Sequence, residues 1–415
     1  MKLESYSLGI GDRFGREGAA QLRAFQQAEA RGATVVPVWN KSHREHSLIG
    51  TRPEDVRREA DAATRAADWK HGYHVDADHI GMATVDAFVA SSDFFTLDVA
   101  ELIGKPAPDA ELAAFVDDMA PFTGVLRVPG LAPLEVTDAM LVQIGRDYLY
   151  AAGEAGRTYR HIAAAKGPDR FITEVSADET TTPQSPLALF FILGALAREQ
   201  VPLQTIAPRF SGKFLKGVDY VGDVATFERE LVADLAVVRH AIDVFGLPPS
   251  LKLSIHTGSD KFSLYPAIRR AIRACGAGLH VKTAGTTWLE EVIGLAQSGP
   301  RGLAIAKHIY VHAHARFDEL CRPYATVVEI DRARLPPPAV VEGWSGDQLV
   351  RQLRHDPSCP DYNRDLRQLV HVSFRVAAEL GPAFDAALDD ARDIVGTCVT
   401  GNLFDRHLRP LFVDP

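Results

Sequence analysis

The chain has 415 residues, of which 46% are hydrophobic and 24% charged, and its formal net charge at pH 7 is -9. This length suits one barrel-sized domain or two smaller ones, and the composition is ordinary for a globular protein. The negative charge argues against a nucleic-acid partner, because such proteins carry an excess of basic side chains. We find no apolar run that could cross a membrane and no signal peptide, so we expect a cytoplasmic protein with no membrane contact.

The four cysteines are scattered along the chain without a paired spacing. Zinc clusters and disulfide frameworks usually show short, regular cysteine spacings. We therefore expect reduced thiols, mostly structural, at Cys275, Cys321, Cys359 and Cys398.

Short apolar segments alternate with helical segments over the first three quarters of the chain. The predicted strands are 6–11, 34–39, 73–81, 94–98, 171–176, 203–208, 250–256, 279–282 and 308–314. The predicted helices are one ending near residue 31, then 52–69, most of 84–170, one opening at 183–186, then 225–245, 266–275 and 287–297. Residues 40–46 are predicted as a polar loop. Strands that alternate with helices indicate a parallel sheet with buried strands.

Polar residues follow nearly every predicted strand. In an open doubly wound sheet they would collect at the switch point, whereas in a (β/α) barrel they surround one end. We therefore predict an α/β TIM-barrel-like fold over residues 1–330, with the open sheet as the alternative. Residues 331–415 begin with a proline-rich stretch and continue as helices 345–355, 361–379 and 383–394. We interpret them as a C-terminal helical extension packed on the barrel.

Glycines at positions 9, 11 and 15 follow the first predicted strand and invite comparison with a dinucleotide-binding loop. Their spacing is one residue too long for that fingerprint, and Arg13 and Phe14 are bulky where the backbone must approach a pyrophosphate. The sequence therefore disfavours a bound nicotinamide.

The segment 73–81 carries several ionisable groups on one predicted strand. His74, Asp76 and Asp78 alternate, so on a strand they share one face, and His79 follows directly. Burying such groups is costly unless they are paired or bind a metal, and His with carboxylates suits a divalent cation. A strand that runs into a polar loop is the alternative interpretation.

We predict a divalent metal cation, which could be zinc, manganese, cobalt or nickel. The proposed ligands are His79 and His256, because each ends a predicted strand and would lie at the barrel mouth. Hydrogen-bonded core histidines are the alternative. For the third ligand Asp219 and Glu174 are both candidates, and we predict Asp219.

Several segments together resemble the bacterial tagaturonate epimerases, which interconvert tagaturonate and fructuronate in hexuronate catabolism and have relatives used as tagatose 4-epimerases. The segments are 39–42, 74–79, 174–180, 216–223, 256–263, 280–286 and 402–407, in this order along most of the chain. The resemblance implies an isomerase that acts on a sugar acid, and whether it also accepts neutral ketohexoses such as tagatose and fructose is left open. Whether it is a homo-oligomer is left open.

The reaction that this resemblance implies inverts a carbon one position beyond the carbon whose proton a ketone acidifies, so simple enolisation cannot achieve it. Transient oxidation would need a nicotinamide, while retro-aldol cleavage and re-addition needs acid/base groups and gains from a metal. We predict Asp78 and Glu174 as the acid/base pair, because they come from different strands of the barrel. Glu174 lies in the middle of an apolar strand, where burial without a purpose is unusual.

Basic and acidic side chains in the loops provide candidates for substrate recognition. Lys282 ends its strand and could pair with a substrate carboxylate or with a neighbouring Glu; a Schiff-base role is also open. The other candidates for binding hydroxyl and carboxylate groups, for which ordinary ion pairing is the alternative, are Arg209, Lys213, Asp260 and Lys261. His312 and His314 would share one face of the predicted strand 308–314.

Two other functions compete with the epimerase. A metal-dependent aldolase or sugar isomerase on the same barrel would use similar residues, and product analysis separates it from an epimerase. A non-catalytic sugar-binding protein would need neither Asp78 nor Glu174.

Overall fold

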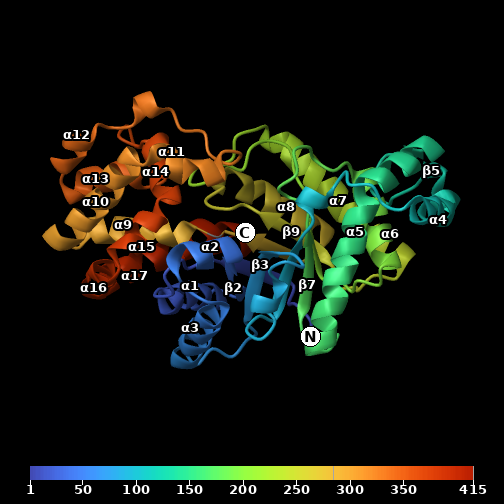
Figure 1. Ribbon diagram of the computed structural model, residues 1–415, viewed down its shortest axis with the longest axis horizontal. Helices are drawn as coiled ribbons and strands as arrows, with labels where there is room; N and C mark the ends of the chain where they lie inside the picture. The colour runs from blue at the N-terminus through green and yellow to red at the C-terminus, as the bar shows by residue number, and fades with distance from the viewer. Residues whose placement is uncertain (284, 415) are drawn as a thin grey trace.

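The computed structural model of the protein describes residues 1–283 and 285–414 (Figure 1). The barrel strands are β1 (Tyr6–Ile10), β2 (Val36–Ser42), β3 (His74–Ile80), β4 (Phe94–Asp98), β7 (Ile172–Ser176), β8 (Thr205–Ala207), β9 (Lys252–His256) and β10 (Leu279–Lys282). They pair in the closed order β1-β10-β9-β8-β7-β4-β3-β2, and every pairing is parallel. The predicted (β/α) barrel is therefore confirmed, and the open sheet is wrong.

Helices surround the barrel and continue beyond it. Those before residue 300 are α1 (Gly18–Glu29), α2 (His43–Ile49), α3 (Pro53–Ala66), α4 (Asp109–Met119), α5 (Asp138–Lys166), α6 (Pro186–Arg198), α7 (Val224–Phe245), α8 (Tyr265–Cys275) and α9 (Thr286–Gln297). Those after it are α10 (Pro300–Ala315), α11 (Phe317–Cys321), α12 (Pro338–Glu342), α13 (Gly346–Leu353), α14 (Arg364–Val372), α15 (Phe374–Leu380), α16 (Pro382–Asp390), α17 (Arg392–Gly401) and the π-helical segment η7 (Asn402–Val413). A small hairpin of β5 (Gly124–Leu126) and β6 (Leu134–Val136) lies beside α4 at one edge of the molecule (Figure 1).

The inside of the barrel changes from apolar to ionisable along the strands. At the amino-terminal end, Leu3, Val38, Phe94 and Ile172 form a small buried apolar cluster. Two residues further along β2, β4 and β7, the chain carries the polar side chains Asn40, Thr96 and Glu174, so the carboxyl ends of the strands hold the reactive groups.

The C-terminal helices both extend the barrel and complete its outer ring. Helices α10 to α16 gather beside α9, in the orange and red part of Figure 1. The last two segments, α17 and η7, return to the barrel and pack on α1, and η7 also packs on α8. Helix α9 is buried from Thr286 to Ala296 because the C-terminal helices cover the side that faces away from the strands. This layer begins at α10, while a domain boundary near residue 330 stays a prediction.

The predicted strand 308–314 is wrong, because these residues belong to helix α10. Its buried residues Gly302, Ala306, Ile309 and Ala313 recur every three or four positions, which is the period of a helix. The alternation of His312 and His314 spans too few residues to distinguish this period from that of a strand. His308 and His312 lie one turn apart with stacked rings, 3.9 Å between centroids. His312 and His314 are therefore not a pair on a strand face.

The predicted loop 40–46 is also wrong. Strand β2 continues to Ser42, which then caps α2: the Ser42 hydroxyl accepts from the Glu45 backbone N–H while the Glu45 carboxylate accepts from the Ser42 N–H. This reciprocal arrangement is a capping box, whose sequence signature is Ser followed three residues later by Glu.

The glycine-containing loop after β1 holds a carboxylate of its own. The Asp12 side chain accepts hydrogen bonds from the backbone N–H groups of Phe14, Gly15, Arg16 and Glu17. These amides are the groups that a pyrophosphate would need, and the loop joins strand β1 of a closed barrel to helix α1. The geometry therefore agrees with the sequence in disfavouring a dinucleotide here.

Among the described residues, no helix is long and apolar enough to cross a membrane.

Candidate active site

A bulge at the end of β3 brings two neighbouring side chains to the same place. Ala77 pairs with Phe95 and Ile80 pairs with Leu97, so Asp78 and His79 together oppose a single residue of β4. His79 has a φ of 53°, in the left-handed region that a non-glycine residue rarely occupies. As a result the Asp78 Oδ1 atom lies 2.9 Å from His79 Nδ1, although consecutive residues of a regular strand point to opposite faces. Such strain usually marks a functional position.

A second histidine is held in the same manner from the other side of the barrel. His256 ends β9, and its Nε2 atom lies 2.8 Å from Oε1 of the fully buried Glu174 on β7. Each histidine thus uses one ring nitrogen to contact a carboxylate, which fixes the ring orientation and leaves the other nitrogen available.

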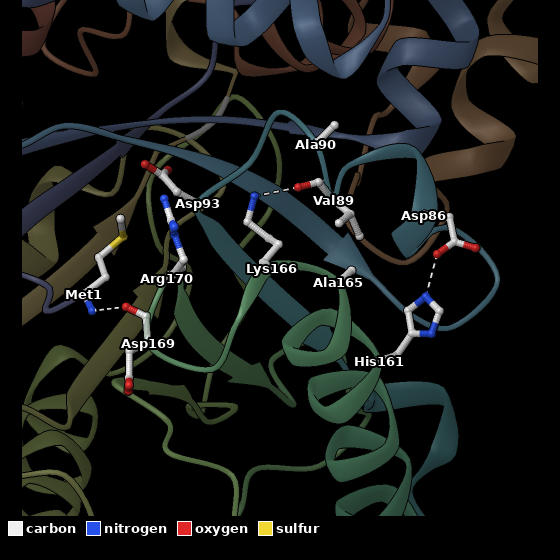
Figure 2. Close-up of a pocket in the computed structure, with 10 residues that line it drawn as sticks. All are labelled: Met1, Asp86, Val89, Ala90, Asp93, His161, Ala165, Lys166, Asp169 and Arg170. Carbon is white, nitrogen blue, oxygen red and sulfur yellow. Dashed lines mark hydrogen bonds and ion pairs between the residues drawn. The ribbon is translucent and has the colours of Figure 1, made fainter.

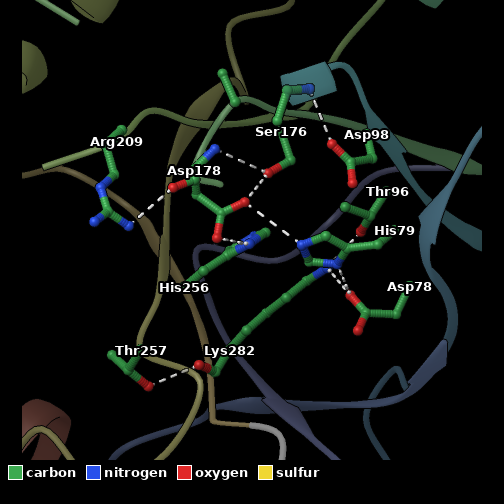
Figure 3. A network of polar contacts seen from close by, with 12 residues as sticks. Asp78, His79, Thr96, Asp98, Ser176, Asp178, Arg209, His256, Thr257 and Lys282 are labelled. Carbon is green, nitrogen blue, oxygen red and sulfur yellow. Dashed lines mark hydrogen bonds and ion pairs between the residues drawn. The ribbon is translucent and has the colours of Figure 1, made fainter. Parts of the chain in front are cut away.

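The two remaining nitrogens point to a third residue, Asp178, directly after β7 (Figure 3). His79 Nε2 lies 3.5 Å from Asp178 Oδ1, and His256 Nδ1 lies 3.2 Å from Asp178 Oδ2. Both nitrogens are buried and have no hydrogen-bond partner of acceptable geometry among residues 1–283 and 285–414. One ligand atom from each of the three residues lies within 4.8 Å of the others. This His-Asp-His group has the donor types and the supporting carboxylates that a divalent cation needs.

The ionisable side chains in this group strongly shift one another's pKa values. Burial alone would lower the pKa of both histidines, but Asp78 and Asp178 raise the pKa of His79 well above its usual range, and Asp178 and Glu174 raise the pKa of His256 to about 9. Burial opposes ionisation of Asp178, yet His256 and His79 hold its pKa well below normal. Negative charge therefore dominates the site, and a bound cation would replace protons on the two rings.

Lys282, at the end of β10, lies beneath this group in the barrel. Its ammonium is 2.7 Å from Asp76, 2.9 Å from Asp78 and 3.0 Å from Glu174, and it also donates to Thr96. Burial lowers the pKa of Lys282, but the three carboxylates outweigh burial and raise it well above normal. A Schiff base requires a neutral amine, so this environment is unfavourable for that alternative. Burial raises the pKa of Asp76, the deepest carboxylate, to about 7.

A cavity of about 440 Å³ opens over these residues at the carboxyl ends of the strands. Its polar and charged lining consists of Asn40, Asp78, His79, Asp178, Glu179, Thr180, Thr181, Arg209, Lys213, Lys216, His256, Lys282, Thr326 and Glu329. Of the predicted substrate-binding residues, Arg209, Lys213 and Lys282 are in this lining. Arg209 donates to the Asp178 backbone oxygen at 3.1 Å, and Lys213 pairs with Glu329 at 2.5 Å.

A larger cavity, of about 1070 Å³, lies at the opposite end of the barrel (Figure 2). Its lining includes Met1, Asp93 and Arg170, which precede barrel strands. Its polar groups largely satisfy one another: His161 contacts Asp86, Lys166 donates to the Val89 carbonyl, and the amino terminus contacts Asp169. We therefore place the active site in the smaller cavity.

Glu174 differs from Asp78 in its access to this cavity. Its side chain is completely buried and absent from the cavity lining. Its carboxylate accepts from Thr205 at 2.7 Å and also contacts His256 and Lys282. These contacts fit a group that orients His256 better than the predicted partner in proton transfer to substrate, a role that stays a prediction.

Three predicted site residues lie outside this constellation. Asp219 does not join the His-Asp-His group, because its carboxylate accepts from the Ser263 hydroxyl at 2.9 Å and from backbone N–H groups. Asp260 and Lys261 are completely buried behind the cavity wall. Asp260 contacts Arg367 at 2.6 Å along with His355, His407 and Thr286, so it ties the β9 loop to the C-terminal helices.

Asp178 and Asn40 are among the residues that the geometry brings to the site and that were not predicted from the sequence. Asp178 comes directly after a strand that carries Glu174, so its position at a strand end was the available signal. Asn40 on β2 is 2% exposed and lines the cavity, and neither atom of its amide has a hydrogen-bond partner among the described residues. A buried unpaired amide in an active site commonly awaits a ligand group.

Comparison with known proteins agrees with the resemblance noted in the sequence. Residues 1–379 match the family model described as tagaturonate epimerase. The tagaturonate/fructuronate epimerase of Thermotoga maritima is 29% identical over 386 residues, which cover 89% of this chain and 72% of the relative.

Solved structures show the same relationship. The glycerol-bound crystal structure of fructuronate-tagaturonate epimerase UxaE from Cohnella laeviribosi superposes with a TM-score of 0.80 at 26% identity, covering 99% of this chain and 82% of that one. The native crystal structure of the same protein gives a TM-score of 0.71 at 26% identity, covering 97% of this chain and 82% of that one. A match over most of the chain, with the same fold, makes this chain a member of the tagaturonate epimerase family and an enzyme of the isomerase class.

Proposed function

We propose that this enzyme interconverts D-tagaturonate and D-fructuronate with the help of a divalent cation bound by His79, Asp178 and His256. The observation that carries the proposal is the arrangement of the two histidines. Each has one nitrogen fixed by a carboxylate, and the free nitrogens both face Asp178. All three residues line the cavity at the barrel mouth. Family membership supplies the substrate pair.

His79, Asp178 and His256 would hold the cation through two imidazoles and a carboxylate. A divalent cation bound there would supply Lewis-acid stabilisation for negative charge on the substrate's ketone oxygen. Imidazole and carboxylate ligands suit zinc, manganese, cobalt and nickel, so the ligand set does not choose among them.

The inversion proceeds best by cleavage and re-formation of a carbon–carbon bond. A base removes the proton from the hydroxyl on the carbon to be inverted, the bond to the neighbouring carbon breaks, and an aldehyde and an enolate result. The aldehyde turns, the enolate attacks its other face, and an acid returns the proton to the new alkoxide. Atoms and electrons balance without an oxidant, which agrees with the unfavourable dinucleotide loop after β1.

Two carboxylates in the cavity lining are suited to the proton transfers. Asp178 is assigned to the cation, which leaves Asp78, Glu179 and Glu329. Glu329 pairs with Lys213 and Asp78 with Lys282, so we choose Asp78 and Glu179 because these two lie at the ends of barrel strands. They come from the ends of different strands, β3 and β7. We assign them as the acid/base groups, with Glu174 as the residue that orients His256.

Turnover in deuterated water tests both the activity and the route. The enzyme should convert D-tagaturonate to D-fructuronate, and the inverted carbon should remain free of deuterium because its hydrogen travels with the aldehyde. Incubation with the cleavage fragments, dihydroxyacetone and tartronate semialdehyde, should also yield traces of both epimers. Deuterium at the inverted carbon would exclude the cleavage route, and a tightly bound nicotinamide without product from the fragments would favour oxidation. Accumulation of fragments without epimer would indicate an aldolase instead.

A further inference from the structure

Lys216 is a cation in the cavity wall to which neither the sequence analysis nor the mechanism gives a role. It lines the active-site cavity and is half-buried. Among residues 1–283 and 285–414, no carboxylate or hydrogen-bond acceptor contacts its ammonium, whereas Arg209, Lys213 and Lys282 in the same lining all contact protein oxygens. A positive charge in a concave site without a protein partner favours an anionic ligand.

The position of Lys216 is fixed by the chain on both sides of it. The Lys216 backbone N–H donates to the Val327 carbonyl at 2.8 Å, and the Gly217 N–H donates to the hydroxyl of buried Ser259 at 2.9 Å. The Gly217 carbonyl accepts from the buried Arg367 guanidinium at 2.5 Å. Since the backbone is held at both residues, a ligand that binds the ammonium needs to order only the side chain.

The Lys216 ammonium lies beside Gly258, two residues after the proposed cation ligand His256. A Cβ atom on Gly258 would lie 3.1 Å from Lys216 Nζ. Gly258 has a φ of 65°, so glycine is favoured there for its backbone as well as for the room it leaves. A six-carbon acid whose ketone binds at the His-Asp-His group could therefore present its other end to Lys216.

We propose that Lys216 binds the carboxylate of the substrate and makes the enzyme select sugar acids over neutral ketohexoses. This inference rests on the proposed function, because it takes the substrate to be a hexuronate with its ketone at the His-Asp-His group. Lys216 is thus a specificity-determining residue, and it has no part in proton transfer.

The variant Lys216→Met, which keeps the length of the side chain and removes its charge, tests this assignment. A charge-assisted hydrogen bond is usually worth about tenfold to a hundredfold in affinity. The KM for D-tagaturonate should rise by that factor, while kcat/KM for neutral D-tagatose should change less than about threefold. Lys216→Arg should restore part of the preference. Lys105 is exposed and absent from the cavity lining, so Lys105→Met removes the same charge and should leave the kinetics with both substrates unchanged.

Binding measurements keep this test independent of catalysis. Wild-type enzyme should bind D-gluconate more tightly than D-sorbitol in titration calorimetry, and Lys216→Met should lose that difference with its metal content unchanged. If wild type prefers gluconate but does not epimerise tagaturonate, the proposed function fails and the role of Lys216 stands. The assignment of Lys216 is overturned if its Met variant keeps the preference for acids, if acid and neutral substrates weaken equally, if wild type shows no preference, or if Lys213→Met removes the preference instead.

Discussion

The Asp78 carboxylate lies 2.9 Å from Nδ1 of His79, the next residue in the chain, because a bulge turns both side chains to the inside of the barrel. Asp78 also contacts Lys282 at 2.9 Å. Asp78 therefore both orients the proposed cation ligand His79 and lines the cavity. Burial would raise the pKa of Asp78, but Lys282 and His79 hold it well below its usual range, so Asp78 is ionised at neutral pH.

Glu174→Gln separates the two roles considered for that residue. The amide keeps the shape but weakens the contact with His256, and loss of such a supporting carboxylate usually costs about 10- to 100-fold in metal affinity. Activity should fall at limiting metal and recover substantially with excess divalent cation. If saturating metal restores none of the lost rate, Glu174 acts in proton transfer, as the sequence analysis predicted. Metal titration followed by activity provides the measurement.

Asp78→Asn and Glu179→Gln test the proposed acid/base pair. An amide cannot exchange a proton at neutral pH, and removing a general acid or base typically costs about 10²- to 10⁴-fold in rate. Both variants should lose at least the lower figure in kcat, and Glu179→Gln should keep its metal because Glu179 is outside the His-Asp-His group. A near-normal kcat for Glu179→Gln would remove Glu179 from the mechanism.

Asp260 should prove essential for stability and not for substrate affinity. It is completely buried and contacts Arg367, His355 and His407. Breaking a buried ion pair from one side costs about 3–5 kcal/mol. Asp260→Asn should lower the free energy of unfolding in urea by this order, while the KM of the folded fraction stays near wild type. The more exposed Asp219→Asn serves as a comparison. A normal unfolding midpoint for Asp260→Asn, together with a raised KM, would return Asp260 to the substrate-binding residues.

His280 provides a prediction about pH and stability. Its Nδ1 atom contacts the Ser7 hydroxyl at 2.8 Å inside the barrel, and burial is the main cause that lowers its pKa from 6.5 to about 3. Lys282, His256 and Lys252 lower the pKa of His280 further, while Glu174 opposes them.

Since the folded-state pKa of His280 is depressed, the unfolded chain takes up a proton at this position first as the pH falls. His280 leaves the free energy of unfolding unchanged above pH 6.5. Between pH 6.5 and about pH 3 it lowers that free energy by about 1.4 kcal/mol for each pH unit. His280→Gln, which cannot titrate, should therefore show a smaller loss of unfolding free energy between pH 6.5 and pH 5 than wild type. Equal slopes for the two proteins would contradict a neutral buried His280.

Much of the fold could be predicted from the sequence because barrel strands are short, apolar and followed by polar residues. Strands β3, β7 and β9 were predicted within two residues at either end. The failure at α10 has a simple cause: three histidines in a short window suggested alternation, whereas the helical period appears only over the whole segment from 300 to 315. The Ser42–Glu45 spacing of the capping box is present in the sequence and indicates a helix start inside the predicted loop 40–46.

The types of residue in the candidate site could be predicted from the sequence, but not which carboxylate meets the two histidines. His79 and His256 could be proposed because both end strands, and the structure brings their rings to 5.3 Å between centroids. The choice among Asp178, Asp219 and Glu174 depends on which side chains meet in space, which spacing along the chain does not give. Asp260 and Lys261 have charges suited to binding a sugar acid, but both are completely buried. Asp260 contacts Arg367 of α14, and the Lys261 ammonium donates to the Leu215 carbonyl at 2.9 Å.

Metal content of wild type and Asp178→Asn, measured alongside turnover of D-tagaturonate, tests the central claim most directly. Wild-type enzyme should contain close to one divalent cation per chain, lose activity on chelation and regain it when the cation is restored. Asp178→Asn, which removes the charged ligand while both histidines remain, should bind the cation at least tenfold more weakly. Full turnover by metal-free wild type, or unchanged metal affinity in Asp178→Asn, would contradict a catalytic cation at His79, Asp178 and His256.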